Sequence, residues 1–229
     1  MKLLSIDSST PLLSVALLDK QHILSEQARD HSPPAHNPLL SLVDQVLSDA
    51  GIPLKEVSGY IFTNGPGSFT GLRVGLSLIK GFVLATEKPV LGVSSLKAWA
   101  SLSGNNSERV CSLLDARKGE VYYALFQKSG DDLTPLGDEE VLSPTEVLNR
   151  IDQPVEFVGP GSDRYKDFFT EHLKNRFQKS APPGSPTVAG AAGKIGLKNF
   201  EKNSSFNLNQ LNLRYLRKPE AEINFKGNP

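Results

Sequence analysis

Apolar residues in the first fifty positions follow two different periods. Short apolar runs at 3–6, 12–18 and 22–27 are separated by polar turn residues, and this spacing predicts three strands of an antiparallel meander. Over 38–50 apolar side chains recur every three or four residues, which predicts an amphipathic helix. Its periodic positions are Leu39, Leu42, Val43, Val46 and Leu47. A glycine and a proline follow closely and are expected to end it.

The next fifty residues alternate strands with helices. The apolar run 57–63 predicts a strand that leads into a glycine-rich turn, and the periodic stretch 71–86 predicts a helix. A strand over 90–93 and a helix over 95–102 complete this part of the chain. Strand–helix–strand order at this spacing implies a right-handed parallel crossover, as in α/β folds.

The second half resembles the first when the sequence is shifted by 108 residues. The shift places Leu114 and Asp115 on Ile6 and Asp7, and the Ala-Leu pair at 124–125 on the pair at 16–17. In both copies an apolar strand ends near an aspartate, a polar turn follows, and a second strand begins. Four matched positions fit both an ancient duplication and two unrelated hairpins with polar turns, and duplication is favoured when the fold family is also considered.

The remaining segments are less regular. Polar residues 129–140 predict a loop, 154–161 a strand and turn, and 165–177 a helix. Residues 180–186 read SAPPGSP and are typical of a linker. A helix rich in alanine and glycine is expected over 187–200.

Charge is balanced along the whole chain. Lys and Arg together number 25, as do Asp and Glu, so no global attraction to nucleic acid or an anionic membrane is expected. Folding can still gather lysines on one side, which leaves a local basic face open. The tail 192–229 has a small basic excess that is typical of solvated surface.

Cysteine use and the N-terminal sequence indicate a cytoplasmic protein. Cys111 is the only cysteine, so no intrachain disulfide forms, as suits a reducing compartment. Asp7 interrupts the first apolar run, and no small-residue cleavage pattern follows, which argues against a signal peptide. We expect no membrane span, because no segment approaches the roughly 20 apolar residues required.

The segment GPGSFTG at 65–71 follows a strand and opens a helix, where backbone N–H groups can hold phosphate. It lacks the Gly-Lys-Ser/Thr ending of a P-loop and the glycine spacing of a dinucleotide fingerprint. Gly65, Gly67 and Ser68 are therefore candidate nucleotide contacts. The alternative is a tight turn in which Ser68 or Thr70 caps the helix.

The helix behind this turn carries a broad apolar stripe. Leu72, Leu76, Ile79 and Val83 form it, and Leu78 and Phe82 widen it, which predicts burial against more than one surface. Packing inside the protein and contact with another chain both fit this stripe.

Other chemistry-bearing residues form weaker patterns. Asp7 and Asp115 each end a first strand, where a carboxylate can face a bound metal–phosphate, although turn chemistry also explains them. His31 and His36 lie five residues apart across two prolines, so they cannot share a helix face as metal ligands do. Cys111 lies in an apolar run where an inert thiol is expected.

The runs LLSIDSST, FTNGPGSFTGLRVGLSLIKGFVLA, VLGVSSL, LLDARKGEVYYALF and RYLR together resemble the TsaB (YeaZ) family. The resemblance covers most of 1–127 and a patch near 214–217. It implies an actin-like, sugar-kinase-like (ASKHA, RNase H-like) duplicated fold, α/β in class, with two lobes of mixed five-stranded sheets and flanking helices. The first lobe is expected over 1–103, completed by 205–229, and the second over 104–204.

The same resemblance implies a non-catalytic accessory subunit. Such a subunit activates a catalytic partner of the TsaD type, with an ATPase subunit of the TsaE type, for threonylcarbamoyl transfer to the tRNA adenosine beside the anticodon. It implies a homodimer when alone, tRNA contact only through the complex, no membrane, and no intrinsic cofactor. ATP or ADP is expected only within the assembly, near Asp7, Gly65, Gly67 and Ser68.

The family resemblance also assigns a partner interface to the helices 38–50 and 71–86. The residues carried over are Leu39, Leu42, Val43, Val46, Arg73, Leu76, Ile79, Lys80 and Val83. The catalytic relative holds a metal with two histidines on one helix, and this sequence lacks that pair.

Two other function classes stay open. An actin-like kinase or ATPase would use Asp7 and Asp115 around a metal nucleotide. A peptidase has the weakest basis, because the sequence shows no nucleophile–base set and no metal site.

Overall fold

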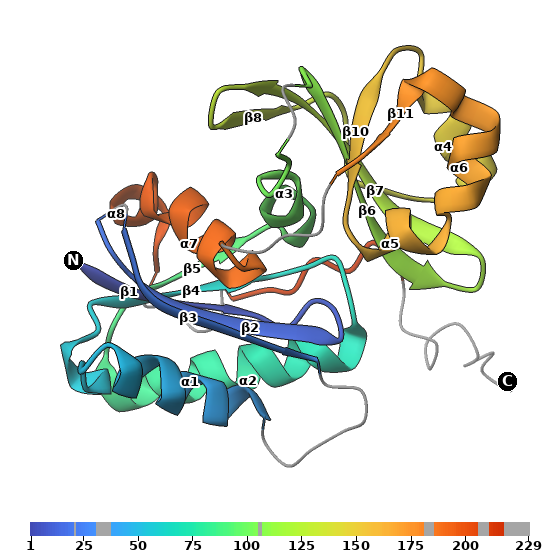
Figure 1. Ribbon diagram of the computed structural model, residues 1–229. Helices are drawn as coiled ribbons and strands as arrows, with labels where there is room; N and C mark the ends of the chain where they lie inside the picture. The colour runs from blue at the N-terminus through green and yellow to red at the C-terminus, as the bar shows by residue number, and fades with distance from the viewer. Residues whose placement is uncertain (21, 31–37, 105–106, 181–185, 206–210, 218–229) are drawn as a thin grey trace, which may run out of the picture.

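The computed structural model describes residues 1–229 except 21, 31–37, 105–106, 181–185, 206–210 and 218–229. The chain forms two lobes, each built on one sheet (Figure 1). The first sheet has the strand order β3-β2-β1-β4-β5. These strands are β1 (Lys2–Asp7), β2 (Leu12–Asp19), β3 (His22–Asp30), β4 (Gly59–Thr63) and β5 (Val90–Val93). Because β1, β2 and β3 pair antiparallel while β4 and β5 join in parallel, the predicted meander and the parallel pairing are confirmed.

The second sheet repeats this topology. Its strands are β6 (Arg109–Arg117), β7 (Glu120–Ser129), β8 (Asp132–Pro135), β9 (Glu140–Leu142), β10 (Val155–Val158) and β11 (Phe177–Lys179). The order β8-β7-β6-β10-β11 matches that of the first sheet element by element, and β9 adds to β7. The shared order supports the duplication inferred from the 108-residue shift.

Three strands of the second sheet lie where the sequence predicted other structure. β8 falls within the stretch 129–140 expected to be a loop, β9 begins at the last residue of that stretch, and β11 begins at the last residue of the stretch 165–177 expected to be a helix. They are three or four residues long, and β8, which pairs with β7, buries only Leu133 of its four residues. Cross-strand pairing rather than local apolar pattern produces them, so periodicity does not detect them.

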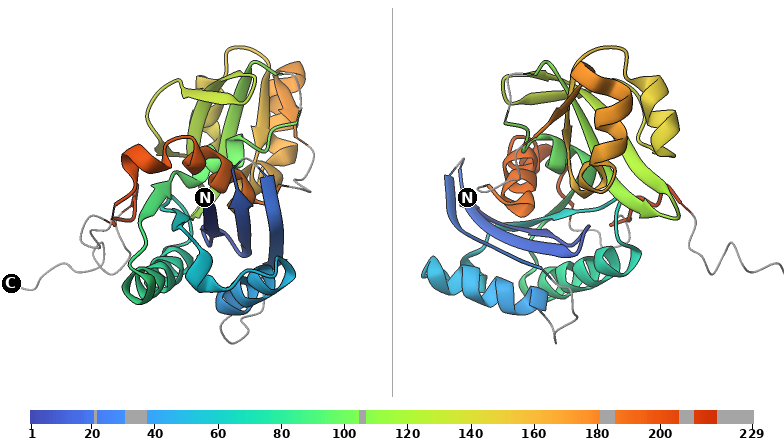
Figure 2. Two further views of the ribbon diagram at one scale, coloured as in Figure 1. Left: turned by 90° about the vertical axis from the view of Figure 1, so that its left-hand side faces the viewer. Right: turned by 45° about the vertical axis from the view of Figure 1, so that its right-hand side comes forward.

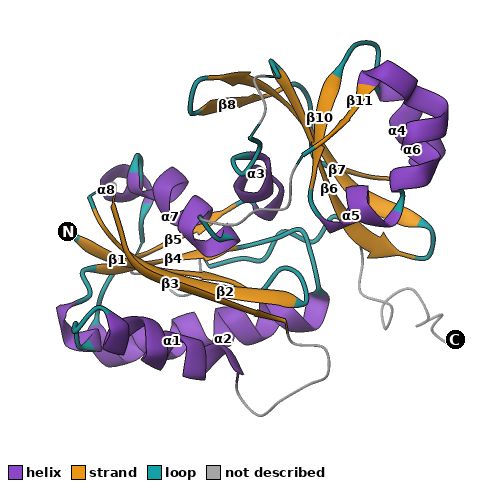
Figure 3. Cartoon of the chain, viewed as in Figure 1, coloured by secondary structure: helices purple, strands orange, loops and turns teal. Residues whose placement is uncertain are grey.

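Helices cover both faces of the first sheet (Figure 3). The helices α1 (Pro38–Asp49) and α2 (Phe69–Thr86) lie side by side on one face, as Figure 2 shows from two further directions. On the other side lie α3 (Ser95–Ala100), α7 (Val188–Leu197) and α8 (Phe200–Asn203). The second lobe carries α4 (Pro144–Arg150), α5 (Pro160–Arg164) and α6 (Lys166–Leu173). Short 3-10 turns occur at Leu54–Glu56 and Lys174–Arg176.

A helix that follows each sheet in the chain packs on the sheet of the other lobe. The helix α7 follows the last strand of the second sheet, yet it packs on β1, β2 and β4 of the first. The helix α3 follows the last strand of the first sheet and packs on β6 and β7 of the second. Close approach requires small residues: a Cβ on Gly193 would lie 2.4 Å from Leu18 Cδ1, and one on Gly196 would lie 2.7 Å from Ile61 Cδ1. The lobe boundary at 103/104 stays a prediction, since these helices connect the lobes.

Candidate functional site

The helices α1 and α2 bury their periodic stripes against the first sheet. Six of the nine predicted interface residues lie in this core, at most 5% exposed. They are Leu39, Leu42, Val43, Val46, Ile79 and Val83. This corrects the sequence assignment, because side chains enclosed in the lobe's own core cannot contact a partner in this conformation. Arg73 is exposed, and Leu76 and Lys80 are half-buried.

The outer side of the same helix pair is also apolar. Leu40 is 39% exposed, Val74 50% and Leu84 70%. A groove of about 540 Å³ runs along the pair. Its lining includes Leu40, Phe69, Thr70, Arg73, Val74 and Leu78. We call the groove and Leu84 the α1–α2 face. Exposed large apolar side chains gathered on one surface mark an interaction site.

The apolar character of α2 is strong enough to raise a second interpretation. Over its 18 residues the mean hydropathy is 1.3, so by length and composition alone it could cross a membrane. This corrects the expectation that no segment comes near that threshold. The helix nevertheless contributes Leu72, Ile79, Phe82 and Val83 to the buried interior, so it is a core helix whose outer side is apolar as well.

A C-terminal segment borders the α1–α2 face. Residues 211–217, here called the strap, run from the first lobe to the β6–β7 hairpin (Figure 1). The ring of Tyr215 lies 5.1 Å from that of Phe69, and its hydroxyl accepts a 3.2 Å hydrogen bond from Arg73 Nε. The Arg73 guanidinium carbon lies 3.8 Å from the centre of the Phe69 ring, a cation–π contact.

The two ends of the strap are anchored in different lobes. The backbone N–H of Arg214 donates to the Asn64 carbonyl at 2.7 Å, directly before the glycine-rich turn. Arg217 donates to the Ala116 carbonyl at 2.9 Å and pairs with Glu120 at 2.7 Å, both in the second lobe. The strap therefore ties the start of α2 to the second lobe.

The glycine-rich turn packs against the β1–β2 loop. A Cβ on Gly67 would lie 2.3 Å from the Ser9 carbonyl oxygen, and one on Gly71 would lie 2.2 Å from that of Ser8. The Ser68 N–H donates to Ser9 O at 2.7 Å, and Ser68 Oγ accepts from Gly71 N and caps α2. Close packing and capping thus account for these residues, while the nucleotide role of Gly65, Gly67 and Ser68 stays a prediction.

Asp7 is fully buried at the end of β1. Its Oδ1 accepts hydrogen bonds from Thr63 Oγ1 at 2.6 Å, Ser9 Oγ at 2.7 Å and Ser9 N at 3.2 Å. Its Oδ2 has no hydrogen-bond partner among the described residues. Burial raises the pKa of the carboxyl, and the bonds from Thr63 and Ser9 oppose that rise in part.

Asp115 occupies a different environment. Asp7 faces Ser14 across the first hairpin, whereas Tyr122, which lies 108 residues after Ser14, faces Leu114. The two hairpins therefore differ by one residue in pairing register, since Asp115 faces Val121 and not the residue that the shift places on Ser14. Its carboxylate pairs with Arg164 at 2.6 Å on the surface, so the two aspartates do not form the symmetric pair suggested by the sequence.

The remaining candidates add no second site. His31 and His36 lie outside the described residues. Within those residues, no cluster of three or more His, Cys, Asp or Glu side chains could hold a metal. Cys111 is buried, and burial raises the pKa of its thiol well above the ordinary value, which disfavours the nucleophilic thiolate.

Comparison with known proteins identifies the family. The sequence model described as "TsaD: tRNA N6-adenosine threonylcarbamoyltransferase" matches residues 25–225. The tRNA threonylcarbamoyladenosine biosynthesis protein TsaB of Haemophilus influenzae is 33% identical over 185 residues, 75% of this chain and 77% of that protein. This chain belongs to the TsaB family. The resemblance read from its motifs is confirmed, and it is a protein of tRNA threonylcarbamoyladenosine biosynthesis.

Solved structures support the same TsaB assignment. YeaZ from Pseudomonas aeruginosa superposes with a TM-score of 0.78 at 28% identity and covers 94% of this chain and 99% of that one. Ethanolamine utilization protein EutJ from Carboxydothermus hydrogenoformans shares the fold alone, with a TM-score of 0.51 at 14% identity over 84% of this chain and 89% of that one. The predicted ASKHA fold of two lobes with mixed sheets is confirmed.

Proposed function

We propose that this TsaB-family chain is an accessory subunit that binds and activates a catalytic threonylcarbamoyltransferase subunit without transferring the group itself. The observation that carries the proposal is the α1–α2 face, where Leu40, Val74 and Leu84 are exposed on helices whose inner sides already fill the core. A monomer gains nothing from this exposed apolar surface, whereas a partner that covers it gains hydrophobic free energy.

The helix pair can support an interface of ordinary size. A stable interface buries about 800 Å² on each partner, and α2 alone is about 27 Å long at 1.5 Å per residue. In the proposed assembly the partner is a catalytic subunit of the TsaD type, joined by an ATPase subunit of the TsaE type. Without them, two copies of this chain would pair through the same face, because a two-fold interface uses one patch twice.

Activation is expected through population shift. When this chain binds the catalytic subunit through the α1–α2 face, it favours that subunit's competent conformation by as much as its affinity for the two conformations differs. The strap is suited to this role, because Tyr215 contacts the face while Arg217 holds the second lobe. ATP or ADP is proposed to bind only within the assembly, which we place in the cytoplasm.

The kinase or ATPase alternative rests on one observation. The free Oδ2 of Asp7 is a buried carboxylate oxygen without a partner in the described structure, as a metal–phosphate site would require. Two observations argue against this alternative. The N–H groups of Ser68 and Gly71 already donate to Ser9 O and Ser68 Oγ, and Asp115 is paired with Arg164. ATP consumption by the isolated chain that is lost in Asp7→Asn would favour this alternative.

Reconstitution tests the proposed function directly. Threonylcarbamoylated tRNA is measured with the catalytic and ATPase subunits in the presence and absence of this chain, at equal subunit concentrations. We expect modification to require the chain, and we expect the chain alone to yield none. Equal modification with and without it would refute the accessory role, and modification by the chain alone would refute the non-catalytic one.

A further inference from the structure

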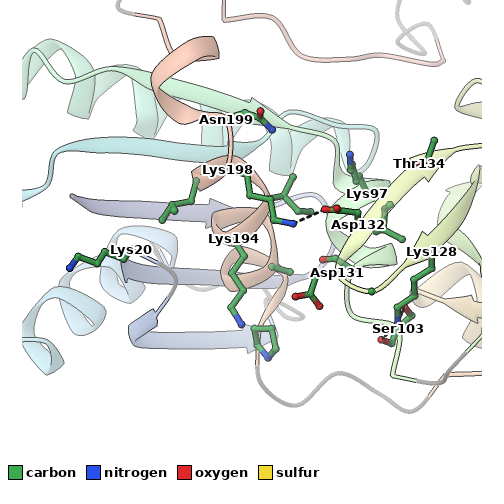
Figure 4. A pocket seen from close by; sticks show the side chains of 17 residues that line it. Lys20, Lys97, Ser103, Lys128, Asp131, Asp132, Thr134, Lys194, Lys198 and Asn199 are labelled. Carbon is green, nitrogen blue, oxygen red and sulfur yellow. Dashed lines mark hydrogen bonds and ion pairs between the residues drawn. The ribbon is translucent and has the colours of Figure 1, made fainter.

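A second surface feature lies between the lobes, away from the α1–α2 face. A cleft of about 660 Å³ is bordered by α7, by α3 and by the β7–β8 hairpin. Figure 4 shows Lys194 of α7 and Lys198, the C-cap of that helix, opposite Asp131, Asp132 and Lys128 of the hairpin. The lobes contribute different walls, so only the folded chain assembles the cleft.

The cleft concentrates lysines. Five lysines and two aspartates line it, so its ionisable side chains carry three more positive than negative charges. The lysines are Lys20, Lys97, Lys128, Lys194 and Lys198. Because the whole chain carries as many basic as acidic residues, this excess is a local arrangement made by folding.

Little of this positive charge is neutralised within the protein. Lys198 pairs with Asp132 at 2.7 Å. Lys128 donates instead to Ser103, to its carbonyl at 2.9 Å and its hydroxyl at 2.8 Å, and these neutral groups leave the ammonium charge uncompensated. In the part of the chain that the structure describes, Lys97 and Lys194 form no ion pair.

The lysines of the cleft act on the neighbouring Asp132. The pKa of Asp132 is lowered by its hydrogen bond and charge interaction with Lys198 and also by the charge of Lys97. Lys194 lies in the last turn of α7 and Lys198 is its C-cap, four residues later, a spacing at which like charges repel slightly. An anion between them would relieve that repulsion.

The residue types indicate the kind of anion. Arginines and a glycine-rich loop, which fix a phosphate in one orientation, are missing from the lining of this cleft. Exposed lysines act as point charges that tolerate many geometries, and several in succession suit the repeated phosphates of a nucleic-acid backbone. The side-chain hydroxyl of Thr134 adds a neutral hydrogen-bond donor.

We propose that this lysine-lined cleft binds the phosphodiester backbone of the RNA that the assembly modifies, with Lys97, Lys194 and Lys198 as the main contacts. The inference rests on the proposed function, because that function supplies RNA as the bound polyanion. The family resemblance implied that tRNA contacts this chain only through the complex. The proposal adds a direct contact between the chain and the RNA.

The test measures tRNA binding by the assembled complex across a range of salt concentrations. One assembly contains wild-type chain, and a second contains Lys97→Gln/Lys194→Gln/Lys198→Gln. A third contains Lys55→Gln/Lys166→Gln/Lys202→Gln, which removes the same charge from exposed positions outside the cleft. Loss of three phosphate contacts should reduce the slope of log affinity against log salt by about two to three in the cleft variant alone.

A variant expected to bind tRNA more tightly is a second test, because misfolding would weaken binding and not strengthen it. Asp132→Asn removes the carboxylate that holds Lys198, and because Asp132 is 78% exposed little cost in stability is expected. It should tighten tRNA binding and steepen the salt slope by about one. Acetylation of lysines with and without tRNA gives a second readout, in which Lys97 and Lys194 should be protected and Lys55 should not.

Each outcome separates this inference from the proposed function. An unchanged salt slope in the cleft variant, with subunit pairing intact, overturns the RNA contact and leaves the accessory role standing. Binding of ATP to the wild-type cleft but not to the cleft variant, without a change in tRNA affinity, assigns the lysines to a free nucleotide and also overturns it. Failure of wild-type subunits to pair refutes the accessory role itself.

Discussion

Gly67 and Ser9 are in contact across the joint between the glycine-rich turn and the β1–β2 loop. A Cβ on Gly67 would lie 2.3 Å from the Ser9 carbonyl oxygen, and the neighbouring N–H of Ser68 donates to that same oxygen at 2.7 Å. An added methyl group would have to displace backbone rather than a flexible side chain. We therefore expect Gly67→Ala to lower the free energy of unfolding by about 1–3 kcal/mol, as overpacking does, measured by urea denaturation.

Gly81 provides the matched control for this substitution. It lies in α2, the helix that Ser68 caps, and a Cβ there would meet nothing within 4 Å. Gly81→Ala should raise the free energy of unfolding by about 0.5–1 kcal/mol, because alanine favours the helix and restricts the unfolded chain. Equal effects at both positions would contradict the contact between Gly67 and Ser9.

The sequence predicts the framework of the first lobe well because its elements carry their own signals. The strands 3–6 and 12–18 and the helix 38–50 appear close to the predicted bounds, since the strands are continuous apolar runs buried on both faces and the helix buries one apolar face. The interface residues carried over from the family resemblance include Leu42 and Ile79, which the structure buries in the lobe's own core. The exposed Val74 and Leu84 lie on the opposite side of the same helix pair, and a resemblance between motifs does not say which side faces solvent.

Features that depend on tertiary structure could not be predicted from the sequence. The lysines of the cleft come from segments as distant as 20 and 198, and no local pattern links them. The one-residue difference in pairing register between the two hairpins arises from their different loop lengths, which a fixed shift of 108 does not reveal. Phe69, just before the predicted helix start, and Tyr215 of the RYLR run were the available signals for the strap contact.

Burial of Asp7 predicts a pH dependence of stability. Its pKa in the folded protein is raised above the ordinary value of 3.8, so between the two values the native state binds more protons than the unfolded state. The contribution of Asp7 to the free energy of unfolding is present below the unfolded pKa and is lost as pH rises through the folded pKa. Asp7→Asn should remove this dependence, since its carbonyl can still accept from Thr63 and Ser9.

The check is the difference in free energy of unfolding between Asp7→Asn and wild type, followed by urea denaturation from pH 4 to pH 7. The difference should grow in favour of the variant as pH rises and then level off. A difference that is constant with pH, or that moves in favour of wild type, would mean that Asp7 is ionised in the native protein at low pH.

Tyr215 gives a way to loosen the strap without touching the core. The tyrosine is 41% exposed, and its ring contacts Phe69 while its hydroxyl accepts from Arg73. Tyr215→Ala should lower the free energy of unfolding by about 0.5–1.5 kcal/mol through the lost aromatic pair. Tyr215→Phe keeps the ring contact and should lose less, which thermal denaturation of the two variants side by side would show.

The α1–α2 face can be tested by charge. Val74→Glu and Leu84→Glu place a carboxylate at positions where the natural side chains are 50% and 70% exposed. The free chain should therefore fold, with a change in the free energy of unfolding within about 0.5 kcal/mol. In an interface the same carboxylate would be buried without a partner, at a cost of several kcal/mol. We expect each variant to weaken pairing with the catalytic subunit, and with a second copy of this chain, by at least about 100-fold.

Leu136→Glu is the control, because Leu136 is 44% exposed in the second lobe and outside the α1–α2 face. It changes charge and hydropathy in the same way and should leave pairing intact. Analytical ultracentrifugation of each variant, alone and with the catalytic subunit, separates loss of pairing from loss of fold when combined with circular dichroism. If Val74→Glu and Leu84→Glu pair as tightly as Leu136→Glu, the exposed apolar side of α2 is not the contact, and the accessory role would have to use another surface.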